Sequence, residues 1–239
     1  MKARSNAGEA TNVQAGSDPR RNDLIPILRR LGRVQQLAPG EHLQRDTSAD
    51  RHLYLVESGG IKLSLVAANG VELIVGLFFE GDTLGPQGLD EAPDEDVATA
   101  FEPTRIRVLP LAMLKELGRH DPRLHRQIFR LASQRIAQLQ RRMLVISKSA
   151  ATERVAGFLV ELGNRRAMPD GSLHLPLSLN DIGCYLCMSL ETVSRLLSQL
   201  EREGVIRKRG RFVDVLDRKR LIALAGEAGF DADSWSNST

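Results

Sequence analysis

The most constraining stretch of this sequence is residues 178–200, where the apolar residues fit two short helices that cross at a tight turn. Ser178 and Ser189 are placed to cap these helices, and Asp181 gives the first one a capping-box-like start. On the second helix, apolar residues recur at i, i+3, i+4 and i+7, which predicts a buried stripe. The stripe consists of Val193, Leu196, Leu197 and Leu200. The pattern therefore predicts a helix-turn-helix.

The opposite face of the second helix carries Glu191, Ser194 and Arg195, which are side chains of the types that read bases in a DNA major groove. We predict that Arg195 pairs with guanine through two hydrogen bonds and that Glu191 accepts one from a cytosine amine. Ser194 is expected to add a backbone or thymine contact. Taken alone, this pattern is equally compatible with a plain helical hairpin.

A basic turn follows this pair of helices. Two short apolar strands are expected after Gly204, joined by Arg207-Lys208-Arg209-Gly210-Arg211. Such a hairpin is typical of a wing that contacts DNA phosphates. The residues predicted to contact phosphates are Ser189, Thr192, Arg207, Lys208, Arg209 and Arg211. The wing and the polar helix face together favour double-stranded DNA as the partner.

A long helix is predicted over residues 122–147. Apolar residues recur along it at steps of four and three, as in the seam of a coiled coil. This seam, which we predict to be a homodimer interface, consists of Ile128, Ala132, Ile136, Leu139, Met143 and Ile146. Because Leu124, Phe129 and Leu131 widen the apolar surface, a second side of the helix is available to cover the rest of the chain. The alternative is one amphipathic helix packed within a single chain.

The preceding part of the chain is predicted to be rich in β-structure. Residues 53–56, 61–65, 71–75 and 104–109 have the composition of short strands, and Ser58-Gly59-Gly60 and Asn69-Gly70 are turn signals. A short amphipathic helix over residues 24–31 precedes them. Short strands with frequent turns indicate a small roll or sandwich.

Charge is unevenly distributed along the sequence. Residues 21–120 contain 15 acidic and 11 basic residues, whereas residues 121–151 contain seven lysines and arginines and one acid. This contrast favours a sensor or scaffold domain joined to a domain that binds polyanions. The alternative is that these charged residues only form solvent-exposed faces of helices. No apolar run reaches the roughly 18 residues of a membrane span, and the N-terminus lacks a hydrophobic signal core, so we expect a cytoplasmic protein.

The expected organisation has five parts. Residues 1–20 form a disordered tail, residues 21–117 a β-roll, and residues 118–150 the dimerisation helix. Residues 151–226 form a winged helix-turn-helix, and residues 227–239 a C-terminal tail.

Residues 181–197, DIGCYLCMSLETVSRLL, closely resemble the recognition motif of the FNR branch of the CRP/FNR transcription regulators, which includes FixK-like proteins. Residues 54–59, Asn69-Gly70 and residues 81–85 resemble the family's β-roll of the cyclic-nucleotide-binding type, in the same order. The resemblance covers about residues 24–226. It implies an α+β fold with an N-terminal β-roll, a long dimerisation helix and a C-terminal winged helix-turn-helix.

At several positions where family members bind a cyclic nucleotide or an iron–sulfur cluster, this sequence has other residues. Cyclic-nucleotide binders of the family have a glutamate soon after the second glycine of the β-roll turn, but here Pro86 and Gln87 follow Gly85. The matching later segment, residues 94–96, is acidic and would repel a phosphate. Oxygen-sensing members bind an iron–sulfur cluster through N-terminal cysteines, and this chain has none before Cys184. We therefore expect neither cyclic AMP nor a cluster.

Haem or a catalytic metal would need histidine ligands. The candidates are His42, His52, His120 and His125, and isolated histidines of this kind usually lie on surfaces or at helix caps. A metal-dependent enzyme on a cupin-like barrel would need clustered histidine and glutamate, and no H-x-H pair is present. We therefore expect no metal, no cofactor and no enzymatic activity.

The two cysteines, Cys184 and Cys187, exclude a disulfide scaffold and are too few for a four-cysteine zinc site. Cys187 falls at the turn between the helices, where a left-handed backbone favours glycine. Both are expected to be ordinary reduced thiols. The alternative is a redox switch beside the recognition helix.

The resemblance implies a homodimeric activator that binds palindromes with TTGAT-like half-sites, contacts RNA polymerase, and controls genes of oxygen limitation or nitrogen-oxide metabolism. FixK-type members are often governed by their own expression level. The alternatives are a β-roll that binds an unidentified effector and a thiol-responsive regulator.

Overall fold

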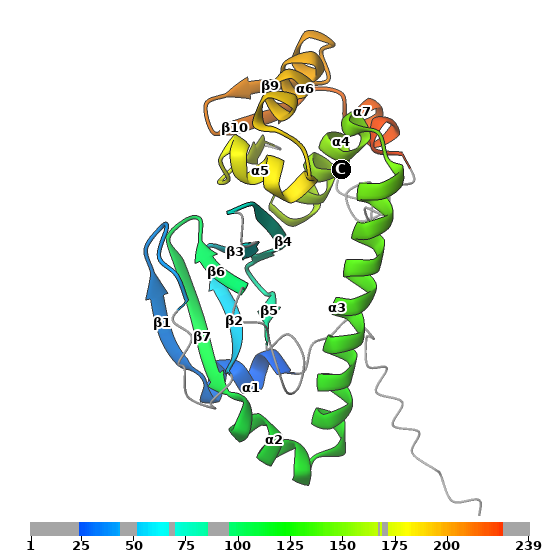
Figure 1. Cartoon of the computed structure of the whole chain (residues 1–239). Helices are drawn as coiled ribbons and strands as arrows, with labels where there is room; N and C mark the ends of the chain where they lie inside the picture. The colour runs from blue at the N-terminus through cyan, green and yellow to red at the C-terminus, as the bar shows by residue number, and fades with distance from the viewer. Residues whose placement is uncertain are drawn as a thin grey trace, which may run out of the picture.

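The computed structural model describes residues 24–43, 52–66, 70–85, 96–166, 168 and 172–226. Figure 1 shows a β-rich part, a long helix that runs beside it, and a group of short helices and strands at the far end of that helix. The fold is α+β, as predicted. The two predicted tails, 1–20 and 227–239, lie outside the described residues.

Among the described residues, the β-rich part contains two antiparallel sheets, with strand orders β1-β7-β2-β5 and β4-β3-β6. Alternating apolar residues of both sheets, such as Val56, Ile61 and Ile106, are at most 1% exposed and form a common core. The predicted roll is therefore confirmed. Its strands are β1 (Arg33–Leu37), β2 (His52–Ser58), β3 (Gly60–Val66), β4 (Glu72–Phe79), β5 (Thr83–Leu84), β6 (Asp96–Ala100) and β7 (Thr104–Pro110).

The step from β2 to β3 depends on glycine. Gly59 has a φ of 83°, and a Cβ at this position would lie 2.3 Å from the carbonyl oxygen of Pro103. Only glycine meets both conditions without strain. The predicted turn at residues 58–60 thus lets the chain cross from one sheet to the other.

Three helices flank the roll: α1 (Leu24–Leu31), α2 (Leu111–His120) and α3 (Pro122–Lys148). Leu24, Leu28, Leu114 and Leu124 are at most 3% exposed and pack together against the roll. Helix α2 was not predicted, and the predicted domain boundary between residues 117 and 118 falls inside it. Asp121 has an extended backbone and caps α3, which separates the two helices.

The remaining elements form one group around a second core, at the end of α3. Leu159, Leu173, Ile182 and Val193 are buried there. The elements are α4 (Ala151–Arg166), β8 (Ser172–His174), α5 (Leu179–Leu186), α6 (Leu190–Arg202), β9 (Ile206–Arg209), β10 (Phe212–Val215) and α7 (Arg218–Ala225). The sheet has the order β8-β10-β9. Helix α7 was not foreseen.

None of the helices described is both long enough and apolar enough to cross a membrane.

Candidate nucleic-acid interface

Both helices of the predicted helix-turn-helix begin at serine caps. Ser178 Oγ accepts a hydrogen bond from the backbone N–H of Asp181 at 3.0 Å, and the Asp181 carboxylate accepts one from the backbone N–H of Ser178. Ser189 Oγ accepts a hydrogen bond from the N–H of Thr192 at 3.2 Å. These caps satisfy first-turn amides that have no partner within a helix. The two predicted helix starts are confirmed.

The turn between α5 and α6 is tight because of two residues. Cys187 has φ 53° and ψ 54°, the left-handed conformation, and is the only non-glycine residue with positive φ in the described part of the chain. A Cβ at Gly183 would lie 2.6 Å from the carbonyl oxygen of Met188, so a larger residue would push the turn away from α5. The expected left-handed backbone at Cys187 is confirmed.

Helix α6 buries its predicted apolar stripe and exposes its predicted polar face. Val193 and the three stripe leucines are at most 4% exposed. Glu191 and Arg195 are exposed and Ser194 is half-buried, so the three lie on one face near the helix N-terminus. Hydrogen bonds from its own backbone N–H and from Ser189 lower the pKa of Glu191. Glu191 is therefore an acceptor at neutral pH, which is the form that a cytosine amine requires.

The wing is formed as predicted. Strands β9 and β10 pair in register, and Gly210 turns between them with a φ of 62°. Arg207 and Arg211 are exposed.

Two of the wing cations are paired with acids of the same chain. Arg209 Nη2 lies 2.5 Å from Asp214 Oδ1, and Lys208 Nζ lies 3.2 Å from Glu201 Oε2. Lys208 Nζ also donates a hydrogen bond to Ser198. The prediction of four equivalent phosphate-binding cations did not include these acidic partners. Exposed ion pairs of this kind are weak, so they reduce the attraction of Lys208 and Arg209 for phosphates without abolishing it.

The six residues of the predicted α3 seam differ in their exposure. Ile136 and Met143 are 58% and 70% exposed, and Ala132 is exposed too. Ile128 packs beside the core under α1 and α2, whereas Leu139 and Ile146 line a cavity beside β4. The assignment of these six residues to a dimer interface therefore stays a prediction, with Ala132, Ile136 and Met143 as its exposed members. An apolar surface still remains, because Phe129, outside the predicted set, is 59% exposed one turn before Ala132.

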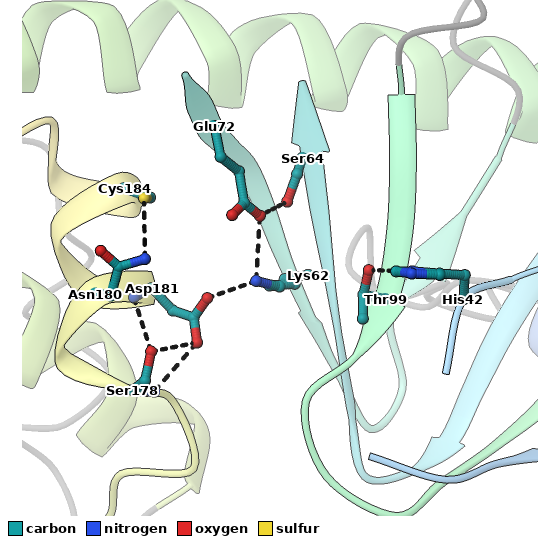
Figure 2. A network of polar contacts seen from close by, with 9 residues as sticks. All are labelled: His42, Lys62, Ser64, Glu72, Thr99, Ser178, Asn180, Asp181 and Cys184. Atoms are coloured by element: carbon teal, nitrogen blue, oxygen red, sulfur yellow. Dashed lines mark hydrogen bonds and ion pairs between the residues drawn. The ribbon is translucent and has the colours of Figure 1, made fainter. Parts of the chain in front are cut away.

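A polar network joins the β-roll to the helix-turn-helix (Figure 2). Lys62 Nζ on β3 lies 2.5 Å from Asp181 Oδ1 on α5 and 3.1 Å from Glu72 Oε1 on β4. Ser64 donates a hydrogen bond of 2.6 Å to the same Glu72 oxygen. The side chains of Lys62 and Asp181 are each 16% exposed, so water screens this pair only in part. The sequence contains no local signal for the pair, because its members are 119 positions apart.

Helix α4 also contacts the roll. Arg165 pairs with Asp82, and Arg166 pairs with Glu102. The Arg165 guanidinium lies 4.6 Å from the centre of the Phe79 ring. These contacts and the Lys62 network together fix the orientation of the helix-turn-helix relative to the roll.

The cysteines differ in their surroundings. Cys187 is exposed, whereas Cys184 is half-buried on α5 and accepts a hydrogen bond from Asn180 at 3.8 Å. Burial, together with the negative charges of Glu72 and Asp181, raises the pKa of the Cys184 thiol. A raised pKa lowers the thiolate fraction and hence the reactivity, which disfavours Cys184 as a redox switch.

Several residues that bear on cofactors lie outside the described part, including Pro86, Gln87, Asp94 and Glu95. His42 is described, and its Nδ1 lies 2.8 Å from Thr99 Oγ1, a contact that holds β6. Within the described residues, no three histidine, cysteine or acidic side chains are grouped as metal ligands.

Both the β-roll and the helix-turn-helix part of the chain match families of known proteins. Residues 34–121 match the family model of the cyclic nucleotide-binding domain, and residues 153–224 match that of the Crp-like helix-turn-helix domain. The chain belongs to the CRP/FNR family of transcription regulators. This is a family of DNA-binding regulators and not of enzymes.

The relatives indicate the branch. Electron transport regulator A of Shewanella oneidensis is 32% identical over 87% of this chain and 84% of its own length. The transcriptional activator protein anr of Pseudomonas aeruginosa is 36% identical over 81% of each chain. The structure of FixK2 from Bradyrhizobium japonicum superposes with a TM-score of 0.74 and 28% identity, over 81% of this chain and 97% of that one. This chain is thus an FNR-type DNA-binding transcription regulator, as the resemblance implied.

Proposed function

We propose that this CRP/FNR-family regulator binds, as a homodimer, palindromic DNA sites with TTGAT-like half-sites. The observation that carries the proposal is the polar face of α6. Glu191, Ser194 and Arg195 lie on this face in the first turns of the helix, which Ser189 caps. Two such helices related by a two-fold axis reach successive major grooves about 34 Å apart. The half-site sequence itself comes from the resemblance to the FNR branch.

The roles of the side chains follow from their chemistry. The Arg195 guanidinium pairs with guanine through two parallel hydrogen bonds, Glu191 accepts from the cytosine amine, and Ser194 contacts the backbone or a thymine. Ser189 and Thr192, whose hydroxyls are 3.2 Å apart at the start of α6, contact phosphates. Arg207 and Arg211 supply most of the sequence-independent attraction, and Lys208 and Arg209 contribute less because they are paired.

The apolar surface of α3 supports a homodimer. Phe129, Ala132, Ile136 and Met143 recur at three-, four- and seven-residue steps, which is the spacing of a coiled-coil seam. A row of exposed apolar side chains on a helix is unfavourable in water and is buried by packing against a second copy.

Activation of transcription, through contact with RNA polymerase, is proposed by analogy with relatives named as transcriptional activators. Other relatives carry the names "Anaerobic regulatory protein" and "Fumarate and nitrate reduction regulatory protein". By the same analogy, genes of oxygen limitation or nitrogen-oxide metabolism are the proposed targets.

The decisive experiment is fluorescence anisotropy with a TTGAT-type palindrome, its single-base variants and an unrelated duplex. Arg195→Ala should cost about 1–3 kcal/mol on the palindrome and remove discrimination at one guanine. Glu191→Ala should relax the preference at one cytosine and leave binding to the unrelated duplex unchanged. Arg202→Ala, on the same helix but outside the polar face, is the matched control. Equal losses on all duplexes for Arg195→Ala would contradict the proposed reading helix.

A further inference from the structure

The wing lies beside α6, and apolar packing holds it only at its base. Figure 1 shows β9 next to α6. Ile206, the first residue of β9, is 0% exposed, whereas the three residues that follow it in the strand are exposed. At the same end of the wing, the backbone N–H of Val205 donates to the carbonyl oxygen of Leu200 at 2.9 Å. Beyond Ile206, β9 therefore depends on polar contacts for its position relative to α6.

The strand register places Lys208 on the side of the wing that faces α6. The cross-strand partner of Lys208 is Val213, which is 1% exposed in the core that α6 also lines. Cross-strand partners have their side chains on one face of a sheet, and adjacent residues point to opposite faces. Arg207 and Arg209 are therefore on the outer face of the wing. There Asp214 pairs with Arg209.

Glu201 on α6 contacts Lys208 through both of its carboxylate oxygens. Glu201 Oε1 accepts a hydrogen bond from the backbone N–H of Lys208 at 2.8 Å, and Glu201 Oε2 lies 3.2 Å from the Lys208 ammonium nitrogen. Strand β9 is an edge of the described sheet, and Glu201 supplies one of its outward amides with an acceptor. The hydrogen bond from this amide is the main cause that lowers the pKa of Glu201, so the residue is ionised at neutral pH.

The same lysine also reaches the polar face of α6. Lys208 Nζ donates a hydrogen bond to Ser198 Oγ at 3.0 Å. Ser198 comes four residues after Ser194 and three after Arg195, so it lies on the same face of the helix, one turn further on. The contacts of Lys208 therefore connect the wing to the face of α6 that carries the residues proposed to read bases.

We propose that Glu201 is a positioning residue for DNA recognition and that it acts through Lys208. By holding β9 against α6, Glu201 sets the position of the outer wing cations relative to the polar face of the helix. Binding to the correct site requires that α6 reaches its bases while the wing reaches its phosphates. The inference rests on the proposed function, because it takes the polar face of α6 as the base reader.

The charge of Glu201 and its positioning role have opposite effects on DNA binding. An anion beside the wing repels phosphates, so loss of its charge alone should strengthen binding to every duplex by one common factor. Loss of the contacts to Lys208 should weaken binding to the palindrome more than to an unrelated duplex, because only the palindrome rewards the correct placement of both elements. The dissociation constant for the unrelated duplex divided by that for the palindrome, here the specificity ratio, separates the two effects.

The test is fluorescence anisotropy on the full-length protein with a TTGAT-type palindrome and an unrelated duplex at one salt concentration. Glu201→Gln keeps an acceptor for the Lys208 amide but loses the ion pair, and should lower the specificity ratio about threefold. Glu201→Ala removes both contacts and should lower the ratio about tenfold. The matched control is Glu203→Gln, which removes an acid paired with Arg220 and should leave the ratio unchanged.

Both dissociation constants are measured on one preparation of each variant, so a fraction of unfolded protein cancels in the ratio. A second set of variants tests the route through Lys208. Lys208→Gln should also lower the ratio, and adding Glu201→Gln to it should lower the ratio no further.

Two results overturn the proposal: equal changes on both duplexes for Glu201→Gln and Glu201→Ala, or full additivity of Glu201→Gln and Lys208→Gln. In either case the proposed function stands as long as the unchanged protein prefers the palindrome and Arg195→Ala loses that preference. An unchanged protein that binds both duplexes equally well overturns the proposed function and this inference with it.

Discussion

The ammonium group of Lys62 on β3 lies 2.5 Å from the Asp181 carboxylate on α5, and the same ammonium lies 3.1 Å from Glu72 on β4. One lysine thus holds together a β-hairpin of the roll and the first helix of the helix-turn-helix (Figure 2). Asp181 also forms the capping box of α5 with Ser178. The orientation of the helix-turn-helix and the start of α5 therefore depend on the same carboxylate.

Lys62→Met should reduce the free energy of unfolding by about 2 kcal/mol, because it leaves two carboxylates without their shared cation in a partly buried site. In a double-mutant cycle measured by urea unfolding, Lys62→Met and Asp181→Asn should show a coupling energy of about 1–2 kcal/mol. Lys115→Met, at an exposed lysine of α2, is the control and should be near neutral. Strict additivity of the two substitutions would mean that the pair contributes nothing.

Acid should weaken the same contact. Burial alone would raise the pKa of Asp181, but hydrogen bonds from Lys62 and Ser178 outweigh it and lower the pKa. A carboxyl group with a depressed pKa contributes stability above its unfolded pKa of about 3.9, and this stability is lost as pH falls through the folded value. The unchanged protein should therefore lose more unfolding free energy between about pH 5 and pH 2 than Asp181→Asn does. Parallel pH curves for the two proteins would refute this assignment.

Because Lys208 and Arg209 are paired with acids, we expect substitutions of the wing cations to weaken DNA binding by different amounts. Arg211→Gln should reduce the dependence of log K on log salt by about one unit, and Arg209→Gln should reduce it by less, because Asp214 already pairs with Arg209. Asp214→Asn should strengthen binding to every duplex and steepen the salt dependence. Fluorescence anisotropy over a salt series measures all three. Equal slopes for Arg209→Gln and Arg211→Gln would show that the pair does not persist near DNA.

A charge on the exposed face of α3 should separate the proposed dimer. Ile136→Glu and Met143→Glu each place a carboxylate in the apolar row, and burial of an unpaired charge is costly. Each should raise the dimer dissociation constant about tenfold or more, measured by analytical ultracentrifugation over a range of concentrations. Gln134→Glu, at an exposed polar position of the same helix, should not. An unchanged dissociation constant in both variants would place the interface elsewhere.

Cys187 should tolerate glycine better than any branched residue. The left-handed backbone conformation of Cys187 destabilises any residue that has a Cβ by about 1 kcal/mol, and glycine avoids this steric cost. Glycine loses more conformational entropy on folding, which offsets part of the gain. Cys187→Gly should leave the unfolding free energy unchanged or raise it by up to about 1 kcal/mol. Cys187→Val should lower it by about 1–2 kcal/mol. Urea unfolding distinguishes these outcomes, and a valine variant as stable as the glycine variant would contradict the strain.

The sequence by itself determined the elements whose signals are local. Ser178, Ser189 and Asp181 predicted both helix starts, and the spacing of Val193 to Leu200 predicted the buried stripe, because caps and helical periodicity act over only a few residues. The left-handed turn at Cys187 and the wing at Gly210 were foreseen for the same reason.

Only the tertiary structure decided which groups of distant segments meet. It divided the α3 seam, directing Leu139 and Ile146 toward a cavity and leaving Ile136 and Met143 exposed, because the face that a helix buries depends on what packs against it. It paired Lys62 with Asp181 across 119 positions and Arg166 with Glu102 across 64. Such pairings depend on the packing of domains and on burial, which no local pattern of residues encodes.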